Sequence, residues 1–376
     1  MANEERINGK KLKDDVMESK KGKALSIVLQ YKVFIILIVI CAAATIGSPH
    51  FLTTSNMFNV MRQISMQGML AVGFTMVLAS GHIDLSVGSA VGLIGVCTAM
   101  ISKLGNGLPM PYITLVLISL VFGIIIGLIN GFVIATLNVP AFVATLSTQT
   151  IMRGTIYVMT GNQHISGIPR ELIYFGQGYI WGNTVPFPVI LLIAVVIIGA
   201  IILRRTKFGR NMIAVGANRD AAHYCGISVK KTIYGAYIMT GLAAAMASLV
   251  LTGRSGTAQT GAGIGMEMDS IAAVVMGGTP MSGGYGNIVG SLGGSLIIGV
   301  ISNMLNLMNV DSNWQYIVKG LLIVAAVLMD VQSTRIQDRM TDRATYTAAT
   351  EESGHDPDDG GPDGSGPGIE LPPADG

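Results

Sequence analysis

The sequence predicts an all-α, polytopic membrane protein of about ten transmembrane segments. Half of the 376 residues are apolar and only 12% are charged, which is about half the charged fraction of an ordinary soluble protein. The charges are clustered, so long runs of the chain carry none. The 48 glycines would allow close helix contacts, which small residues favour in lipid. These observations exclude a soluble globular fold.

The elements follow in a simple order. We expect a cytoplasmic polar leader over 1–32, a transmembrane domain over 33–330 and a disordered acidic cytoplasmic tail over 331–376. The end of the tail, 351–376, has eight acids and no Lys or Arg, and such a segment cannot bury enough apolar surface to order itself. From the end of the leader to residue 330, nine apolar runs are long enough to cross a ~30 Å hydrocarbon layer. These runs lie at about 27–47, 57–80, 85–104, 112–137, 140–160, 187–204, 232–253, 287–309 and 314–330, and a shorter run lies at about 267–279.

The positive charges predict how these segments are oriented. The leader has eight Lys/Arg, residues 204–231 have seven, and the tail after Asp330 has three. Basic flanks stay in the cytoplasm, so all three regions are expected there, with both termini inside. Four crossings must then separate the second region from the third, which requires the run at 267–279 to count as a crossing. A cleaved signal peptide is the alternative for the first run, but the charged leader is too long for one.

Polar residues interrupt the apolar runs at two places. Asp84, followed by Ser86, suits the start of a helix, where a carboxylate accepts backbone N–H groups; the alternative is a broken helix that lines a pathway. In the run over 140–160, Thr148, Gln149 and Arg153 lie among further polar residues, and either helix–helix contact or pathway lining would explain them.

Two acids, Glu267 and Asp269, open the short run, where they suit a positive helix terminus.

No catalytic site, metal site or cofactor is predicted. The glycine-rich segment Gly277–Ser295 lacks the lysine of a phosphate-binding loop. The five histidines have no metal-ligand spacing, and the three cysteines imply no disulfide framework. The glycines are expected instead to form a tight turn and to allow close packing. We expect neither enzymatic activity nor nucleic-acid binding.

A compact polar segment, "FGRNMIAVGANRDAAHYCGISVKK", separates two apolar runs at 208–231. Asn218 can cap a short helix over about 219–225, and Gly226 can supply the left-handed residue that ends it. Ala221, Ala222 and Cys225 would then form a small apolar face, which Ile227 extends. An ordinary basic loop is the alternative.

Five motifs resemble the permease subunit of bacterial monosaccharide ABC importers, the ribose, galactose and xylose group. They occur in order over about residues 30–330: "GHIDLSVGS", "GLINGFVIATLNVPAFVATL", "FGRNMIAVGANRDAAHYCGI", "MEMDSIAAVVMGGTPMSGGYGNIVGSLGG" and "NWQYIVKGLLIVAAVLMD". The second motif contains Asn130, which joins Asp84, Ser86, Thr148, Gln149 and Arg153 as a candidate pathway residue.

The resemblance implies a fold, a function and partners. The fold is two inverted five-helix halves. The function is passage of a monosaccharide by alternating access through a multi-pass protein of the inner membrane, surrounded by lipid. The partners are a second permease chain, a cytoplasmic ATP-binding subunit that receives the helix at Asn218–Ile227, and an extracytoplasmic sugar-binding protein.

The binding protein is expected on the loop Gly161–Pro186 and the stretch Arg254–Met266. Arg170 and Arg254 are the only basic residues expected near it. A sister permease for nucleosides or branched-chain amino acids stays open, as does, more remotely, an ion-coupled secondary transporter.

Overall fold

The computed structural model describes residues 36–104, 110–182, 184–311, 313–321, 323–325, 327–328 and 332. The chain divides into two units, Met1–Asp330 and Val331–Gly376, and only the first is described below. The predicted leader over 1–32 lies outside the described residues, as does the predicted tail over 331–376 apart from residue 332.

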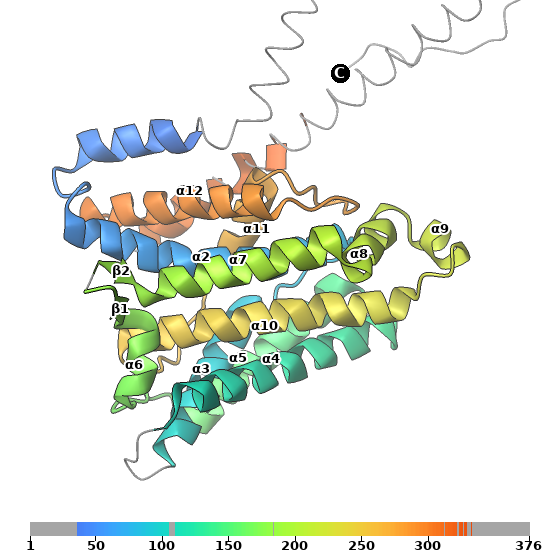
Figure 1. Ribbon diagram of the computed structural model, residues 1–376, viewed down its shortest axis with the longest axis horizontal. Helices are drawn as coiled ribbons and strands as arrows, with labels where there is room; N and C mark the ends of the chain where they lie inside the picture. The colour runs from blue at the N-terminus through green and yellow to red at the C-terminus, as the bar shows by residue number, and fades with distance from the viewer. Residues whose placement is uncertain are drawn as a thin grey trace, which may run out of the picture. The chain divides into compact units, whose positions relative to one another are not determined.

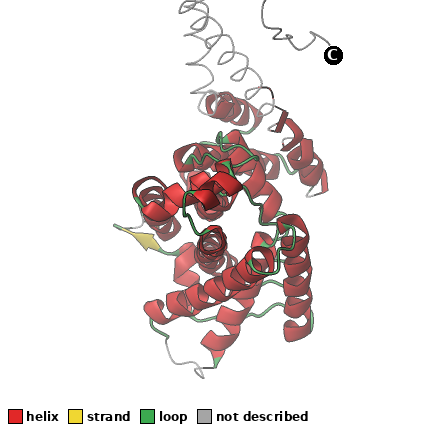
Figure 2. Cartoon of the chain, turned by 90° about the vertical axis from the view of Figure 1, so that its right-hand side faces the viewer, coloured by secondary structure: helices red, strands yellow, loops and turns green. Residues whose placement is uncertain are grey.

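The first unit is a bundle of helices with one small hairpin (Figures 1 and 2). An apolar helix at Ile36–Gly47 comes first. The elements that follow it are α2 (Thr54–Ala79), α3 (Val87–Lys103), α4 (Tyr112–Ala135), α5 (Ala141–Thr160), α6 (Arg170–Gln177), β1 (Tyr179–Ile180), β2 (Val185–Pro186), α7 (Phe187–Arg205), α8 (Lys207–Ala217), α9 (Arg219–Tyr224), α10 (Val229–Ser255), α11 (Met266–Met276) and α12 (Ile288–Leu307). Residues 313–321 are helical as well.

The long helices α2, α7, α10 and α12 lie roughly along one axis, which gives the described bundle two ends (Figure 1). We call them the α6 end, with α6 and the β1–β2 hairpin, and the α9 end, with α8 and α9. Helix α2 runs toward the α9 end, since Phe58 near its start packs on Tyr179 of β1. Helix α10 runs the opposite way, because Gly253 near its end lies against Gly176 of α6.

Helix α10 is central and packs against α4, α2, α3 and α6. Its contact with α4 depends on glycine, because a Cβ at Gly123 would overlap the backbone of Gly241, and one at Gly127 would overlap that of Ile238. Such close backbone contact is what small residues provide between helices in lipid.

Helices α3 and α11 are shorter than the long helices that surround them. Helix α3 has 17 residues and α11 has 11, and irregular backbone precedes each of them. The two breaks meet where Gly88 of α3 lies against Gly263, and a Cβ on either residue would overlap the other's backbone. Gly263 has φ +80°, a conformation that glycine adopts without strain.

Four described helices are long and apolar enough to cross a membrane: α4, α7, α10 and α12. Helices α2 and α5 have comparable lengths of 26 and 20 residues but carry more polar side chains. The all-helical membrane fold therefore agrees with the prediction, while the count of ten crossings remains a prediction. The glycine-rich turn before α12 formed as expected, with positive φ at Gly278, Gly283 and Gly284.

Candidate functional site

Helix α9 has the caps that the sequence predicts. The Asn218 side chain accepts the N–H of Ala221 at 2.9 Å, and Gly226 has φ +79°. The N–H of Ile227 returns to the carbonyl of Ala222 at 3.0 Å, which closes the C-terminus. Both signals are local, and the helix forms where they place it.

The predicted small face of α9 needs one correction. Ala221 and Cys225 are exposed, but Ala222 is only 5% exposed and packs into a core cluster with Ala144, Met212 and other side chains. Since Ala222 is one residue from Ala221, the helix turns it toward the bundle. The exposed side of α9 therefore keeps Ala221 and Cys225 of the predicted small face, beside the strongly exposed Tyr224.

The loops before α3 and α12 pack beside the segment that leads into α9. Gly81 lies against Gly216, and the N–H of Gly284 donates to the Ala79 carbonyl at 3.1 Å. In the same loop, His82 Nδ1 lies 2.8 Å from the Ser80 carbonyl. Burial lowers the pKa of His82, and the nearby positive charge of Arg219 lowers that pKa further, whereas the bond to Ser80 opposes both effects. These contacts connect both loops to α8, the helix that leads into α9.

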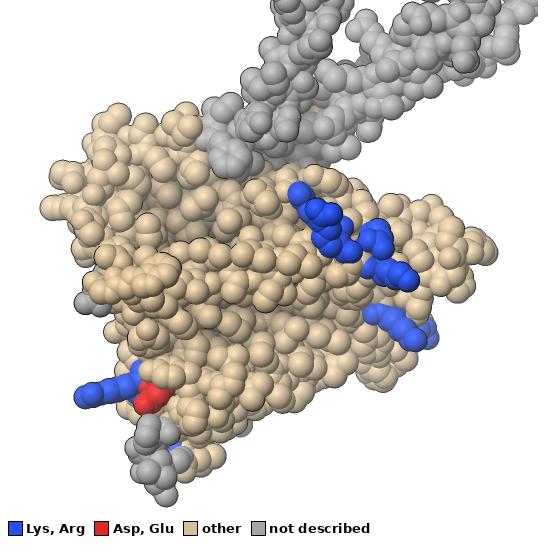
Figure 3. All heavy atoms as spheres, viewed as in Figure 1, with Lys and Arg blue, Asp and Glu red and all other residues tan. Residues whose placement is uncertain are grey.

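Basic side chains gather toward this end (Figure 3). All seven Lys/Arg of residues 204–231 are exposed: Arg204, Arg205, Lys207, Arg210, Arg219, Lys230 and Lys231.

Three candidate pathway residues form one buried cluster. Asp84 accepts the backbone N–H of Ser86 at 2.9 Å, and Asn130 Nδ2 donates to the Ser86 hydroxyl at 2.8 Å. All three are at most 3% exposed. Tyr237 donates to the Ile83 carbonyl at 2.9 Å in the same region. The Asp84 carboxylate therefore accepts a backbone N–H, as the sequence predicts. The N-cap residue of α3, however, is Ser86, two residues further on.

Gln149 and Arg153 border a separate polar cavity between α5 and α11. Gln149 Nε2 donates to Glu267 Oε1 at 3.2 Å. Arg153 Nη1 donates to the carbonyls of Thr260 and Ala262, each at 2.9 Å. Those carbonyls belong to the irregular stretch before α11 and therefore have no helical N–H partner. Arg153 supplies their hydrogen-bond donor. The cavity has a volume of about 520 Å³.

Thr148 lies on another side of α5, away from this cavity. Its hydroxyl bonds the Ala144 carbonyl at 2.9 Å, and it borders a hollow of about 830 Å³ lined almost wholly by apolar side chains. The geometry therefore divides the six candidate pathway residues into three places.

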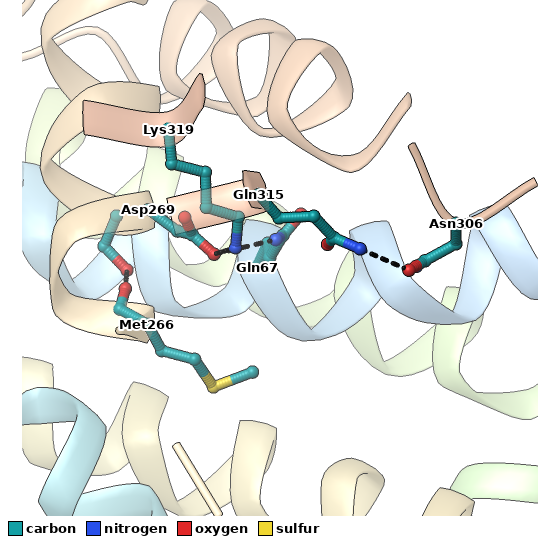
Figure 4. Close-up of polar contacts among 7 residues, drawn as sticks. Gln67, Met266, Asp269, Asn306, Gln315 and Lys319 are labelled. Atoms are coloured by element: carbon teal, nitrogen blue, oxygen red, sulfur yellow. Dashed lines mark hydrogen bonds and ion pairs between the residues drawn. The ribbon is translucent and has the colours of Figure 1, made fainter. Parts of the chain in front are cut away.

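An ion pair that the sequence analysis missed joins α11 to the helical segment 313–321 (Figure 4). Lys319 Nζ lies 2.8 Å from Asp269 Oδ2, with side-chain exposures of 25% and 6%. Gln67 of α2 donates to the same carboxylate at 3.4 Å. In sequence, Asp269 and Lys319 are 50 residues apart, so no local pattern signals the pair.

At the α6 end, Arg170 is exposed and Arg254 is half-buried. The expectation that these are the only basic residues there is wrong. Arg62 lies 4.8 Å from the centre of the Tyr179 ring, and Lys103 donates to the Ser166 carbonyl at 3.0 Å. The stretch after α10 also pairs with the loop after α5 through the bridge between Ile165 and Ala258.

We predict that Lys319→Met destabilises the protein strongly. The change leaves the Asp269 carboxylate buried with one weak donor, and breaking a buried pair in this way costs about 3–5 kcal/mol. The measurement is thermal unfolding in detergent. The double variant Lys319→Met/Asp269→Asn removes both charges and should recover much of the loss. Equal melting temperatures for Lys319→Met and the unaltered protein would refute the role of this pair.

Comparison with known proteins gives consistent matches over most of the chain. Residues 56–327 match the family model described as branched-chain amino acid transport system / permease component. A ribose import permease protein of Haemophilus influenzae is 36% identical over 324 residues, which cover 85% of this chain and 97% of the relative. No solved structure matched.

Two further relatives are similar. The L-arabinose transport system permease protein of Escherichia coli is 38% identical over 309 residues, 80% of this chain and 90% of the relative. The xylose transport system permease protein of Haemophilus influenzae is 33% identical over 376 residues, 83% of this chain and 99% of the relative. The chain therefore belongs to the family of the branched-chain amino acid transport system / permease component, which consists of transport proteins and not of enzymes.

Proposed function

We propose that the chain is the permease subunit of an ATP-driven importer for a monosaccharide. The observation that carries the proposal is its similarity to permeases for ribose, arabinose and xylose along nearly their whole lengths. It forms the translocation pathway and works by alternating access. ATP binding in a partner can drive the switch only if that partner binds the two states with different affinity.

The basic residues support an orientation in the inner membrane. All seven Lys/Arg of residues 204–231 are exposed at the α9 end, and positively charged segments stay in the cytoplasm. In this orientation the α9 end and both termini are cytoplasmic, while the α6 end is extracytoplasmic. The many exposed Ile, Leu and Val side chains of α4 and α7 then face lipid.

Helix directions support two inverted halves. Helices α2 and α10 have 26 and 27 residues and run oppositely. Each is followed by a helix break and a short helix, α3 or α11, and then by a long helix, α4 or α12. This order is that of an inverted repeat. With the helix at 36–47, α5, α7 and the apolar run that the sequence predicts at 314–330, the proposal has ten crossings.

The exposed side of α5 supports a second permease chain. Ser147, Thr150, Gly154 and Tyr157 are all exposed and lie on one stripe of the helix. Hydrocarbon offers no hydrogen-bond partner to the hydroxyls of Ser147 and Tyr157, whereas a second copy, or a pathway between two copies, would provide one. We therefore place a homodimer contact on this side of α5.

The capped helix α9 supports an ATP-binding subunit as the cytoplasmic partner. Asn218 and Gly226 form its ends, Ala221 and Cys225 form its open face, and Ala222 and Ile227 pack toward the bundle. The adjoining loops before α3 and α12 give motion of α9 a route into the helices.

At the α6 end, Arg170 and Arg254, now joined by Arg62 and Lys103, form a basic surface for an extracytoplasmic sugar-binding protein. Such rim charges mainly set the rate of association.

Import of branched-chain amino acids is the second candidate, because the matching family model carries that description. The relatives quoted above favour a sugar.

Transport in proteoliposomes tests the function. The permease with its ATP-binding subunit and binding protein should take up a pentose or hexose only when ATP is present. Uptake that needs neither ATP nor the ATP-binding subunit would contradict the proposal, and uptake of an amino acid would favour the second candidate.

Cysteine labelling tests the orientation. In a Cys41→Ala/Cys97→Ala background, the native and exposed Cys225 should resist an impermeant maleimide in right-side-out vesicles and react after permeabilisation. Thr184→Cys, with Cys225 also replaced by Ala, should react at once because Thr184 is exposed at the other end. The reverse pattern would overturn the orientation.

A pair of arginine substitutions tests the role of α9. Ala221→Arg should leave a folded permease but weaken co-purification of the ATP-binding subunit, because overfilling a packed contact costs about 1–3 kcal/mol. Ala222→Arg should instead lower the yield of folded permease, since that side chain is buried. Arg219→Ala, at an exposed position, is the control and should have the smaller effect. Full ATPase association and coupled uptake by Ala221→Arg would reduce α9 to an ordinary basic loop.

A further inference from the structure

The cavity between α5 and α11 combines open space with unsatisfied polar atoms. Glu267 is 6% exposed and Ser89 is 1% exposed. Glu267 Oε2 and the Ser89 hydroxyl make no side-chain hydrogen bond within the described part of the chain, and both atoms are enclosed, with Oε2 against Gly88 of α3. Both residues line the cavity. Buried polar atoms without partners are rare in folded proteins, and each needs an explanation.

The remaining lining makes the cavity rich in both donors and acceptors. Gln149 contributes an amide, Thr150 and Tyr157 contribute hydroxyls, and Arg153 contributes a guanidinium. One Arg and one Glu make the formal charge of the lining zero. A neutral ligand with several hydroxyls matches such a set, because each hydroxyl both donates and accepts. An anion would instead meet the Glu267 carboxylate.

The size of the cavity also suits a small molecule. Its volume of about 520 Å³ lies within the range of about 300–1,000 Å³ that is common for ligand sites. The larger apolar hollow beside Thr148 offers few polar partners, so it suits a lipid chain rather than a sugar. The described residues hold no group of three metal-ligating side chains.

We propose that this cavity is a sugar-binding subsite within the permease itself, with Gln149, Thr150 and Tyr157 as hydrogen-bonding groups. The inference rests on the proposed function, because it names where the transported sugar pauses. Arg153 balances the charge of Glu267 and bonds the carbonyls of Thr260 and Ala262, in the stretch that leads to the lining residue Ile264. The cavity opens on the side of α5 that carries Thr150 and Gly154, which places the subsite against the pathway between two permease chains. Binding is weak, since a transported ligand must also leave.

Sugar binding to the permease alone tests the subsite. The permease in lipid nanodiscs, without its partners, is titrated with D-galactose and D-ribose under saturation-transfer NMR. We expect a saturable signal in the millimolar range for at least one of the two sugars. Gln149→Leu should weaken that binding about three- to tenfold, the value of one or two neutral hydrogen bonds.

Two threonines of α5 provide a matched comparison. Thr150 borders the cavity and Thr155 borders the apolar hollow, and each hydroxyl bonds the carbonyl four residues earlier, at 3.0 Å and 2.8 Å. Thr150→Val should weaken sugar binding, whereas Thr155→Val should not. Equal affinities for Gln149→Leu, Thr150→Val and Thr155→Val would overturn the subsite.

Charge gives a gain-of-function test. Glu267→Gln leaves Arg153 without its balancing carboxylate, so the preference should shift from D-galactose toward D-galacturonate by at least about tenfold, as expected for a charge-assisted hydrogen bond. An unchanged preference would contradict the assignment of Glu267.

Uptake separates this inference from the proposed function. ATP-dependent uptake without saturable binding to the permease alone overturns the subsite and leaves the function standing. Saturable binding without ATP-dependent uptake overturns the proposed function and leaves the binding site standing.

Discussion

Two breaks in the helical bundle must be hydrogen-bonded from within, and much of the polar chemistry of this protein follows from that need. Hydrocarbon supplies no partners for exposed backbone, so irregular backbone is tolerated at depth only where protein or a cavity satisfies it. At the break before α3, Tyr237 donates to the Ile83 carbonyl and Asp84 accepts the Ser86 N–H. At the break before α11, Arg153 donates to the carbonyls of Thr260 and Ala262.

The same need explains the glycines at the centre of the molecule. The two breaks come into contact through Gly88 and Gly263, where neither residue has room for a Cβ. The long helix α10 can lie beside them because its Gly241 packs directly on the backbone of Gly123 of α4, with no side chain between them. Small residues thus bring backbone close enough for Arg153 of α5 and Tyr237 of α10 to reach carbonyls that the breaks leave open. Asn130 of α4 reaches the Ser86 hydroxyl in the same way.

The sequence predicts well the features that depend on neighbouring residues, such as helix caps. It misses the features that depend on contacts between distant residues. The caps of α9 depend on Asn218 and Gly226, which lie within the same short segment, so their geometry could be anticipated. The direction of Ala222 could not, because it depends on a core cluster that includes the distant Ala144. The pairing of Asp269 with Lys319 and the place of Arg62 over Tyr179 depend on tertiary contacts in the same way. Strands of two residues, such as β1 and β2, carry no periodic pattern at all.

Polar residues of α5 illustrate why structural and functional explanations need not compete. Arg153 uses Nη1 on the backbone of the break, which satisfies a structural requirement. Gln149 holds one oxygen of Glu267, while the other oxygen and the Ser89 hydroxyl keep unused capacity. Leaving a buried polar group unpaired is destabilising, so these two enclosed atoms lower the stability of the contact between α3 and α11. The α5 side chains that line the cavity, Gln149 and Thr150, are those that we infer to bind a ligand with hydroxyl groups. One helix can therefore stabilise the break before α11 through Arg153 and bind a ligand through its other polar residues.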